Sequence, residues 1–291
     1  MANLINTKVL LSVAMIAAAA AVIIGATFAF FSDTETSTGN LFAAGAIDLK
    51  IDNESYITSS SGALVFSQST SWSTTDLTTQ RFFDFTDLKP GDIGEDTISI
   101  EVGSNDAWLC AATRITQDTD ETCTDPESES TDPECSAPTP TPGAGELDSE
   151  VNFAFWKDDG DNVLESDEVQ SIFLQGPISG LGEQGQIALV DGQGGPLGPS
   201  PVPGGSISYI GKAWCFGTPN ATPVTQDGSG KLPNATNGPL VRGTGFACDG
   251  EGVNNAAQTD KVVGDIQFYA VQSRNNAGFD CDEGYTPSWE L

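Results

Sequence analysis

The chain has 291 residues, with 41 acidic against 11 basic side chains and a formal net charge of −30. A field of that sign repels phosphate backbones and anionic lipid, so nucleic-acid binding is excluded and cations or basic polymers are the favoured partners. Histidine is absent, which excludes Ser-His-Asp and Cys-His catalysis, HExxH proteases and histidine metal sites, so no catalytic residue and no required cofactor is expected.

The N-terminal segment is apolar. Between Lys8 and Asp33 no residue is charged, and the residues from 9 to 31 are apolar or small. This pattern predicts an N-terminal hydrophobic helix that acts as a signal peptide over residues 1–29, cut between Ala29 and Phe30. The apolar run exceeds the about 7–15 residues of a signal core, and about 20 residues can span a bilayer. A retained membrane anchor is therefore the alternative, and in both cases the rest of the chain is predicted to be secreted or on the cell surface.

Short runs rich in β-branched and aromatic residues then recur between turn residues, a pattern typical of antiparallel strands. The predicted strands are 46–51, 63–67, 81–85, 96–102, 107–115, 151–156, 170–174, 186–190, 206–216 and 262–273. Apolar and polar residues alternate over Thr97 to Val102, which predicts a half-buried strand, and Lys89 to Asp92 predicts a turn before it. These elements predict an all-β fold, an antiparallel two-sheet β-sandwich in one decorated domain over residues 30–291.

Three polar stretches interrupt the strands and are predicted to be surface loop insertions: an acidic stretch at 117–150, a Gly/Pro-rich one at 176–205 and a polar one at 218–237. The even number of cysteines, without CxxC pairs, indicates disulfides in an exported protein rather than a zinc site. Cys123 and Cys135 flank one acidic loop and are predicted to pair. The pairing of the others stays open: Cys110, Cys215, Cys248 and Cys281.

The most specific chemical pattern is the run "KDDGDNVLESDE", Lys157 to Glu168. An EF-hand-type loop places oxygen ligands around a sharp turn at its sixth position, and aligning Leu164 with the apolar eighth position puts Asn162 at that turn. The resulting candidate ligands for a structural Ca²⁺ ion are Asp158, Asp159, Asp161, Glu165 and Glu168. Lys157 falls at the first ligand position and no helical pattern flanks the run, so a solvated acidic turn is the alternative.

The stretch from Gly25 to Ile51, "GATFAFFSDTETSTGNLFAAGAIDLKI", carries a family resemblance. A Phe-x-Asp segment at residues 31–33 follows the expected cleavage site, and an Asn-x-Phe-x-Ala-Gly-x-Ile-Asp-Leu run occupies residues 40–49. These residues resemble the TasA/camelysin family, whose members carry signal peptides cut by a dedicated SipW-type signal peptidase. The segments "LKPGDIGEDTISIEV" and "FWKDDGDNVLESDE" resemble later blocks of that family. The resemblance implies that the sandwich is a jelly roll.

The resemblance also implies a structural protein of an extracellular fibre, biofilm matrix or cell-surface layer, because TasA-type proteins form matrix fibres. Cleavage would free an extended segment from Phe30 onward, and such a segment can add as a strand to an open sheet edge of the next subunit. Repeated head to tail, this contact makes a filament. The residues expected in the assembly strand are Phe31, Asn40, Phe42, Ala44, Gly45, Ile47 and Leu49.

The partners expected on this interpretation are the SipW-type signal peptidase, further copies of the chain, and other matrix or cell-wall components. A membrane is expected as a partner only through an uncleaved signal segment. Two alternative functions stay open: a camelysin-like cell-surface peptidase, and a membrane-anchored monomeric adhesin or wall-binding module. We do not expect an enzyme, because the chain has no histidine and no recognisable pairing of a nucleophile with a base.

Overall fold

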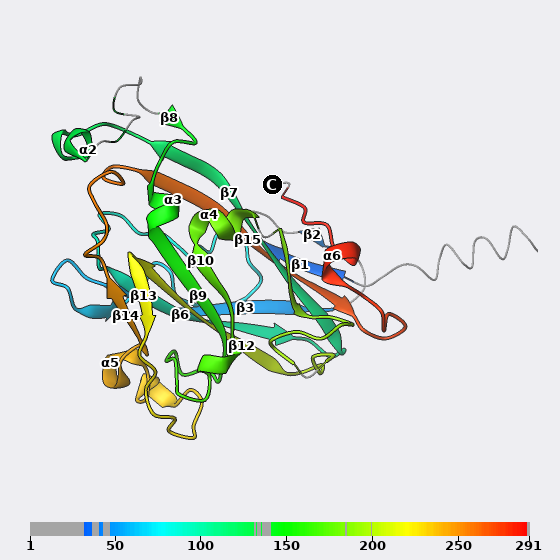
Figure 1. Cartoon of the computed structure of the whole chain (residues 1–291). Coiled ribbons are helices and arrows are strands. Elements are labelled where there is room, and N and C mark those ends of the chain that lie inside the picture. The colour runs from blue at the N-terminus through cyan, green and yellow to red at the C-terminus, as the bar shows by residue number, and fades with distance from the viewer. Residues whose placement is uncertain are drawn as a thin grey trace, which may run out of the picture.

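A computed structural model describes residues 32–36, 41–42, 47–130, 132, 135, 141–183, 185–198 and 200–289. Within them, two antiparallel sheets pack face to face, with loops and short helices around their edges (Figure 1). The antiparallel β-sandwich predicted from the sequence is therefore confirmed. The predicted N-terminal hydrophobic helix and the cleavage site between Ala29 and Phe30 lie outside the described residues.

The first sheet holds the N-terminal strand at one side. Its strands follow the spatial order β11 (Gln186–Val190), β7 (Ala107–Asp120), β15 (Lys261–Gln272), β1 (Ser32–Thr36) and β2 (Leu41–Phe42), and β8 (Thr141–Pro142) also pairs with β7. Its described strands all pair antiparallel. Because β7 and β15 are the long central strands, the short β1 and β2 extend the sheet beyond β15.

The second sheet carries the acidic turn. Its strands follow the order β10 (Ile172–Pro177), β9 (Val151–Asp158), β12 (Ile207–Phe216), β6 (Ile93–Val102), β3 (Leu49–Thr58) and β4 (Leu64–Phe66), and β5 (Trp72–Thr75) also pairs with β3. A separate two-stranded ladder joins β13 (Thr218–Ala221) to β14 (Phe246–Asp249).

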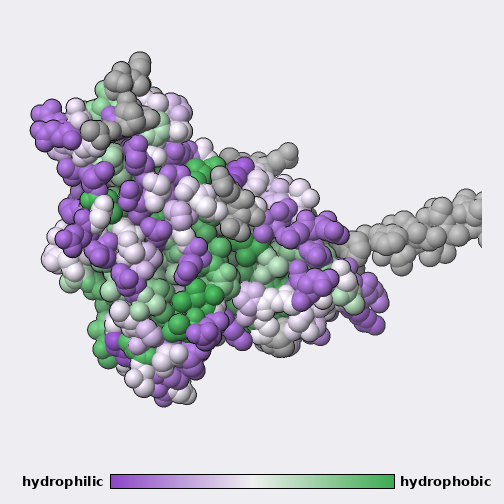
Figure 2. Space-filling model, viewed as in Figure 1, coloured by the Kyte–Doolittle hydropathy of each residue, from purple (hydrophilic) through white to green (hydrophobic). Residues whose placement is uncertain are grey.

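The helices are short and lie in the connections. They are α2 (Asp125–Glu129), α3 (Leu147–Glu150), η2 (Val169–Ser171), α4 (Ile178–Glu183), η3 (Pro233–Ala235), α5 (Pro239–Arg242) and α6 (Cys281–Gly284). No helix in the described ranges is long and apolar enough to cross a membrane. Hydrophilic residues cover most of the face seen in Figure 2, with apolar residues gathered near its middle.

Two apolar cores hold the layers together. The main core lies between the sheets and includes Leu49 and Ile98 from the second sheet and Leu109 and Phe268 from the first. A smaller core covers the outer face of the second sheet. Its buried members are Ala154, Trp156, Leu164, Ala213 and Phe246. The second sheet is therefore covered on both faces, and its outer cover includes the loop at Leu164 and the two-stranded ladder of β13 and β14.

This double cover corrects the prediction of a half-buried strand at Thr97 to Val102. Ile98 and Ile100 of β6 face the main core, but Glu95, Thr97 and Ser99 on the opposite face are also buried, at 0%, 3% and 8% exposure. The reason is tertiary, because the acidic turn after β9 lies over this face and Asp158 accepts a hydrogen bond from the Thr97 hydroxyl at 2.9 Å.

Residues 81–85, predicted to be a strand, are irregular in the structure. Phe82 is only 2% exposed, and its ring centre lies 5.0 Å from that of Trp72 in the second sheet and 5.9 Å from that of Phe268 in the first. Aromatic packing between the sheets holds this segment in place of a strand ladder. The turn predicted at Lys89 to Asp92 is present, because the Asp92 amide donates to the Lys89 carbonyl at 2.8 Å.

A buried ion pair crosses β6 and β12 inside the main core. Asp96 and Lys212 lie opposite each other in the ladder, both side chains are fully buried, and the Lys212 ammonium contacts the Asp96 carboxylate. The Ser55 hydroxyl donates to the other Asp96 oxygen at 3.1 Å. The Lys212 ammonium also lies 3.7 Å from the ring centre of Phe83. Burial lowers the pKa of Lys212 and raises that of Asp96, so each ion depends on the other.

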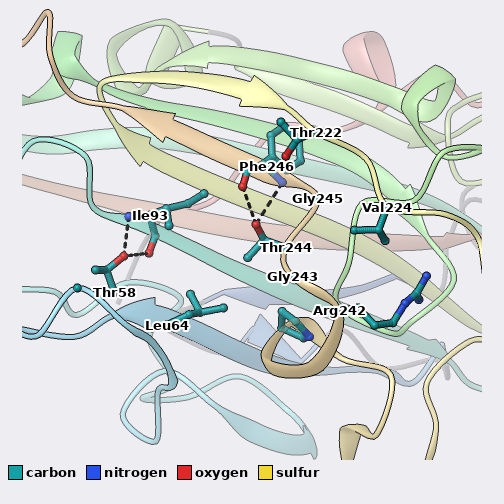
Figure 3. Close-up of a pocket in the computed structure, with 12 residues that line it drawn as sticks. Thr58, Leu64, Ile93, Thr222, Val224, Arg242, Gly243, Thr244, Gly245 and Phe246 are labelled. Atoms are coloured by element: carbon teal, nitrogen blue, oxygen red, sulfur yellow. Dashed lines mark hydrogen bonds between the residues drawn. The ribbon is translucent and has the colours of Figure 1, made fainter.

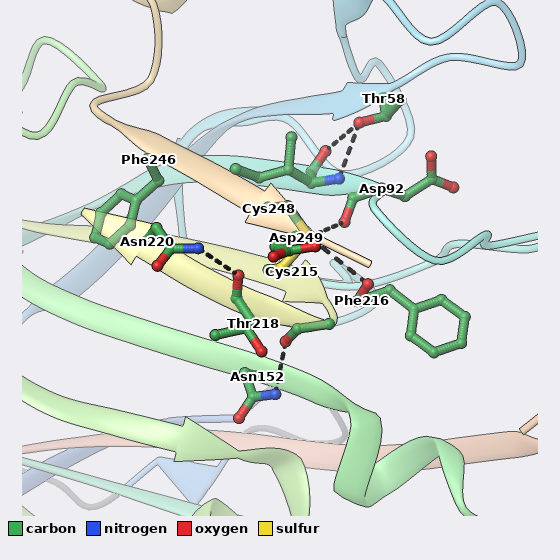
Figure 4. The surroundings of a disulfide bond; sticks show 12 residues. Thr58, Asp92, Asn152, Cys215, Phe216, Thr218, Asn220, Phe246, Cys248 and Asp249 are labelled. Carbon is green, nitrogen blue, oxygen red and sulfur yellow. Dashed lines mark hydrogen bonds between the residues drawn. A yellow bond between two sulfur atoms is a disulfide. The ribbon is translucent and has the colours of Figure 1, made fainter. Parts of the chain in front are cut away.

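All six cysteines are in disulfides. The structure joins Cys123 to Cys135, the pair expected from the sequence. It also joins Cys110 in β7 to Cys281 in α6, and Cys215 at the end of β12 to Cys248 in β14. Figure 4 shows the last of these beside the ladder of β13 and β14. Cys215–Cys248 closes the base of an excursion, residues 218–249, that returns over the outer face of the second sheet.

Candidate metal centre

The acidic turn begins where β9 ends. Gly160 has φ +105° and Asn162 has φ +71°, which is the left-handed region that glycine and asparagine tolerate best. Asn162 is the residue that the sequence placed at the sharp turn. A side chain at Gly160 would lie 3.1 Å from the Tyr209 ring, so the backbone passes close to the sheet. Leu164 then anchors the loop in the smaller core.

Two of the predicted ligands close the loop on itself. Asp158 accepts hydrogen bonds from the Gly160 amide at 3.0 Å and from the Trp156 indole at 3.3 Å, in addition to the bond from Thr97. Glu168 accepts from the Asp159 amide at 2.9 Å with one oxygen and from the Glu165 amide at 3.1 Å with the other. Both carboxylates therefore organise the turn through its backbone.

Arg242, the last residue of α5 in the excursion, forms ion pairs with carboxylates of the acidic turn. Its guanidinium lies 2.6 Å from Asp161 Oδ2, 2.5 Å from Glu165 Oε1 and 3.3 Å from Asp227 Oδ2. Asn237 adds donors to Asp161 at 3.3 Å and to Asp227 at 3.1 Å. The excursion thus brings the guanidinium of Arg242 and the amide of Asn237 to the acidic turn.

Within the acidic turn, three carboxylates each have one oxygen without a hydrogen-bond partner among the described residues: Asp159 Oδ1, Asp161 Oδ1 and Glu165 Oε2. One carboxylate oxygen from each of these residues lies within 4.8 Å of the other two. Asp158, Asp159 and Glu168 form a second such group. The residues predicted as ligands are therefore brought together in two triads that share Asp159.

Burial and mutual repulsion raise the pKa values of several carboxylates in the acidic turn. Burial, followed by the charge of Asp158, raises the pKa of Asp161 to about 8 and that of Glu168 to about 9. Burial also raises the pKa of Asp158 to about 6. Carboxylates whose charge is this costly take up a proton or a cation, so the turn has the chemistry of a hard-cation or proton-binding site.

Glu95 is a buried acid under the same loop that the sequence did not single out. It is 0% exposed, and neither carboxylate oxygen has a hydrogen-bond partner among the described residues. Burial, with the nearby charges of Asp158 and Asp96, raises the pKa of Glu95 well above its usual value. The folded protein therefore keeps Glu95 protonated at pH values where the unfolded chain has lost that proton.

We predict that Glu95→Gln makes stability less dependent on pH. The contribution of protonated Glu95 is fully present below a pH of about 4.3, the ordinary pKa, and declines as pH rises toward the folded-state pKa. Because the amide does not ionise, Glu95→Gln should raise the melting temperature at pH 8 and change it little at pH 4. Thermal scans at both values test this, with Glu101→Gln near the other end of β6 as the control. An equal shift at both pH values would contradict the prediction.

Another carboxylate group lies at the far end of the first sheet. Asp120, Glu127 and Asp260 each place a carboxylate oxygen within 4.8 Å of the others, and Asp120 is fully buried. Glu127 accepts from the Thr259 hydroxyl at 3.0 Å, and Asp260 from the Glu146 amide at 2.6 Å. The sequence pattern did not indicate this group, because Asp260 is remote in sequence from Asp120 and Glu127, which lie in the acidic stretch at 117–150.

A surface pocket adjoins the acidic turn on the side of Arg242. It lies between the β3–β4 connection, the start of β6 and the segment leading into β14, and Figure 3 shows Arg242 at one end of it. Among its described lining residues, Arg242 is the one charged side chain. The Thr58 hydroxyl forms hydrogen bonds with the backbone of Ile93, and the Thr244 hydroxyl forms them with the backbone of Phe246. Both of these hydroxyls therefore bond to the protein's own backbone.

The predicted assembly residues divide into two groups. Phe31, Asn40, Ala44 and Gly45 lie outside the described residues, and Phe42 ends β2. Ile47 and Leu49 are 4% and 0% exposed in the main core, and β3 pairs with β6 from Leu49 onward. Within one chain, the last residues of the donor region predicted from Phe30 to Leu49 are therefore held in the sandwich by core burial, and strand donation by this region stays a prediction.

Sequence reasoning missed the residues that reach the acidic turn from the excursion. Arg242, Asp227 and Asn237 follow Glu168 by 59 residues or more in the numbering, so local spacing does not connect them to it. The one signal in the sequence was composition: with 11 basic residues against 41 acidic ones, an arginine is expected to form an ion pair with a carboxylate.

Comparison with known proteins adds one relationship. A family model described as camelysin metallo-endopeptidase matches residues 4–61. No curated protein and no solved structure matches the chain. The matched segment includes β1, β2 and β3 and does not reach the acidic turn. Over residues 4–61 this chain is similar to the camelysin/TasA family.

Proposed function

We propose that the protein is a secreted, non-catalytic structural protein that assembles into an extracellular fibre or surface layer by donating its N-terminal strand to a neighbouring subunit. The observation that carries this proposal is the position of β1. It pairs with β15 from Ser32 opposite Val271 to Thr36 opposite Gln267, and it connects to the sandwich through the segment before Ile47.

The strand β1 is suited to exchange because it is short and its contacts are mostly with one strand. If it left, β15 would present an unpaired edge, and a row of unpaired backbone groups accepts another strand. The same segment of a second copy would satisfy that edge with identical pairing, as in domain swapping. Repetition in one direction gives a heterologous contact that propagates as a filament.

The family match over residues 4–61 is a second observation that supports this proposal. The matched residues 4–61 contain the exchanging strand and the segment that links it to β3. Removal of residues 1–29 by a SipW-type signal peptidase would leave β1 near a free N-terminus, as donation requires. A mature chain that begins at Phe30, read by mass spectrometry, supports this step, and an intact apolar segment would support the anchored adhesin instead.

We expect that deletion of Phe30–Gly39 leaves a folded monomer that no longer polymerises. The sandwich would keep its core, since Ile47 and Leu49 remain, but the strand that is donated would be missing. Electron microscopy of the secreted material measures fibres directly, and circular dichroism checks the fold. Fibres of normal length from this variant would refute strand donation.

A point variant in β1 gives a matched test. Thr34 pairs with Tyr269, and Thr34→Pro removes an amide donor from that ladder. Thr34→Pro should shorten or abolish fibres, whereas Thr34→Val, which keeps the backbone donor and favours strands, should polymerise normally. Equal polymerisation of the two variants would show that this pairing does not carry the assembly.

One other candidate is favoured by a specific observation, the metallo-endopeptidase description of the matched family. In this chain, which lacks histidine, a catalytic metal would depend on carboxylates alone, and zinc sites of that kind are unusual. We expect purified protein to leave casein intact. Chelator-sensitive cleavage of casein that is lost in the Glu165→Gln/Glu168→Gln double variant would support the peptidase.

A further inference from the structure

We propose that Asp159, Asp161 and Glu165 hold one Ca²⁺ ion, and that this ion fastens the excursion, residues 218–249, to the acidic turn. The inference does not depend on fibre assembly, because every residue it uses lies within one chain. It also divides the five ligands that the sequence pattern indicated into three that bind the ion and two, Asp158 and Glu168, that shape the turn.

Each of the three ligand carboxylates has one oxygen without a hydrogen-bond partner among the described residues. Asp161 and Glu165 each give one oxygen to Arg242, and their other oxygens, Asp161 Oδ1 and Glu165 Oε2, have no hydrogen-bond partner in the described chain. These two residues are 3% and 0% exposed. A buried carboxylate oxygen without a donor is costly, so a cation bound to these two oxygens would remove that cost.

The spacing suits a single ion. Ca²⁺ binds oxygen at about 2.3–2.6 Å, so two of its ligands lie at most about 5 Å apart. One oxygen from each of Asp159, Asp161 and Glu165 lies within 4.8 Å of the others. The oxygen of the neighbouring Asn162 side chain also lacks a donor within the described residues, and water completes the six to eight ligands that Ca²⁺ prefers.

The ligand chemistry selects a hard divalent cation. All the ligand atoms are oxygens, which excludes the softer metals that prefer nitrogen or sulfur. The ligands come from an irregular turn, and Ca²⁺ accepts variable coordination whereas Mg²⁺ demands a near-ideal octahedron. The guanidinium of Arg242 contacts Asp161 Oδ2 and Glu165 Oε1, which leaves Asp161 Oδ1 and Glu165 Oε2 for the ion.

The excursion is attached at two places that the ion would connect. Its base is closed by the disulfide Cys215–Cys248. Farther from the disulfide, two backbone hydrogen bonds join the excursion to Leu164 of the acidic turn. The Val224 amide donates to the Leu164 carbonyl at 3.1 Å, and the Leu164 amide donates to the Thr244 carbonyl at 2.9 Å. An ion bound beside Arg242 would hold those contacts closed, since Arg242, Asp161 and Glu165 form one network.

The first experiment uses the unmodified mature protein. After treatment with EGTA and dialysis, calorimetric titration with CaCl₂ should show binding of Ca²⁺ with a stoichiometry of one ion per chain. A hundredfold excess over the dissociation constant should raise the melting temperature by about 5 °C or more. No heat of binding together with an unchanged melting temperature would overturn the proposal, and this outcome does not depend on any variant.

Limited proteolysis tests where the ion acts. Lys231 lies in the excursion and its side chain is 48% exposed, so trypsin can cut after it once the excursion opens. We expect cleavage at Lys231 to be several-fold slower with Ca²⁺ than with EGTA, read on reducing gels because Cys215–Cys248 keeps the pieces together. Equal rates in the two conditions would overturn the fastening role.

Variants then locate the ion. Asp159 is partly exposed and its carboxylate has an open oxygen, so Asp159→Asn should weaken Ca²⁺ binding by on the order of tenfold while the fold survives. Asp167→Asn is the matched control, because this exposed residue of the same loop bonds to Gln226 and lies outside both triads. Binding that is unchanged in Asp159→Asn, or lost instead in Asp120→Asn, would overturn the assignment.

Discussion

Replacement of Lys212 by methionine should lower the free energy of unfolding by about 3–5 kcal/mol, because it leaves a buried carboxylate without its counter-ion. Lys212 and Asp96 are both 0% exposed, and the substitution removes the ammonium while it keeps a side chain of similar length. Asp96 would then keep one hydrogen bond, from Ser55. Guanidinium chloride unfolding, with the disulfides intact, measures the loss.

Two further variants separate charge from packing. Lys50→Met makes the same replacement in an exposed pair, where the Lys50 and Asp48 side chains are 40% and 59% exposed, and should cost less than about 1 kcal/mol. The double variant Asp96→Asn/Lys212→Met removes both charges and should recover much of the stability, because an uncharged pair needs no counter-ion. If Lys212→Met were as stable as Lys50→Met, the buried pair would not hold the core.

Loss of the Cys110–Cys281 disulfide should be the other large effect. Cys110→Ala/Cys281→Ala is expected to cost about 2–5 kcal/mol, because the bond closes a long loop and restricts the unfolded chain. The sequence separation is 171 residues. The bond also holds α6 on the first sheet, where Tyr285 stacks on Tyr269 with ring centres 4.5 Å apart. Alanine fills the buried positions without adding a polar group.

Cys123–Cys135 provides the comparison for this prediction. Its sequence separation is 12 residues, so loop-closure entropy predicts that removing Cys110–Cys281 costs about 2 kcal/mol more. Denaturant unfolding of Cys110→Ala/Cys281→Ala and Cys123→Ala/Cys135→Ala gives that difference directly. A larger loss from the short-loop variant would show that native packing, rather than the unfolded chain, decides these energies.

Local patterns predicted the elements whose causes are local. Strands such as β12 and β15 follow from runs of β-branched and aromatic residues, and the turn at Pro90 and Gly91 follows from residues that adopt turn angles at little cost. The acidic turn was also predicted, and Asn162 does take the left-handed conformation expected there. The segment at 81–85 shows the limit, since its aromatic residues read as a strand but pack as irregular chain between the sheets.

The candidate metal centre also combines features that local sequence predicts with features that only tertiary contacts decide. Its carboxylates are adjacent in sequence, so spacing alone indicated them. Which oxygens stay open was decided by Arg242 and Asn237, which reach the turn from an excursion that the chain makes only after it has completed β12. Contacts between segments so far apart depend on the packing of the whole sandwich and leave no periodic trace in the sequence.

By itself, the sequence determined the strand periods, the acidic character, the family resemblance at the N-terminus and the acidic turn. Only the tertiary structure decided that the polar face of β6 is buried, that Lys212 lies in the core beside Asp96, and that β1 pairs with β15. The physical reason is that alternation along a strand assigns side chains to two faces, whereas the exposure of each face depends on which remote segment covers it.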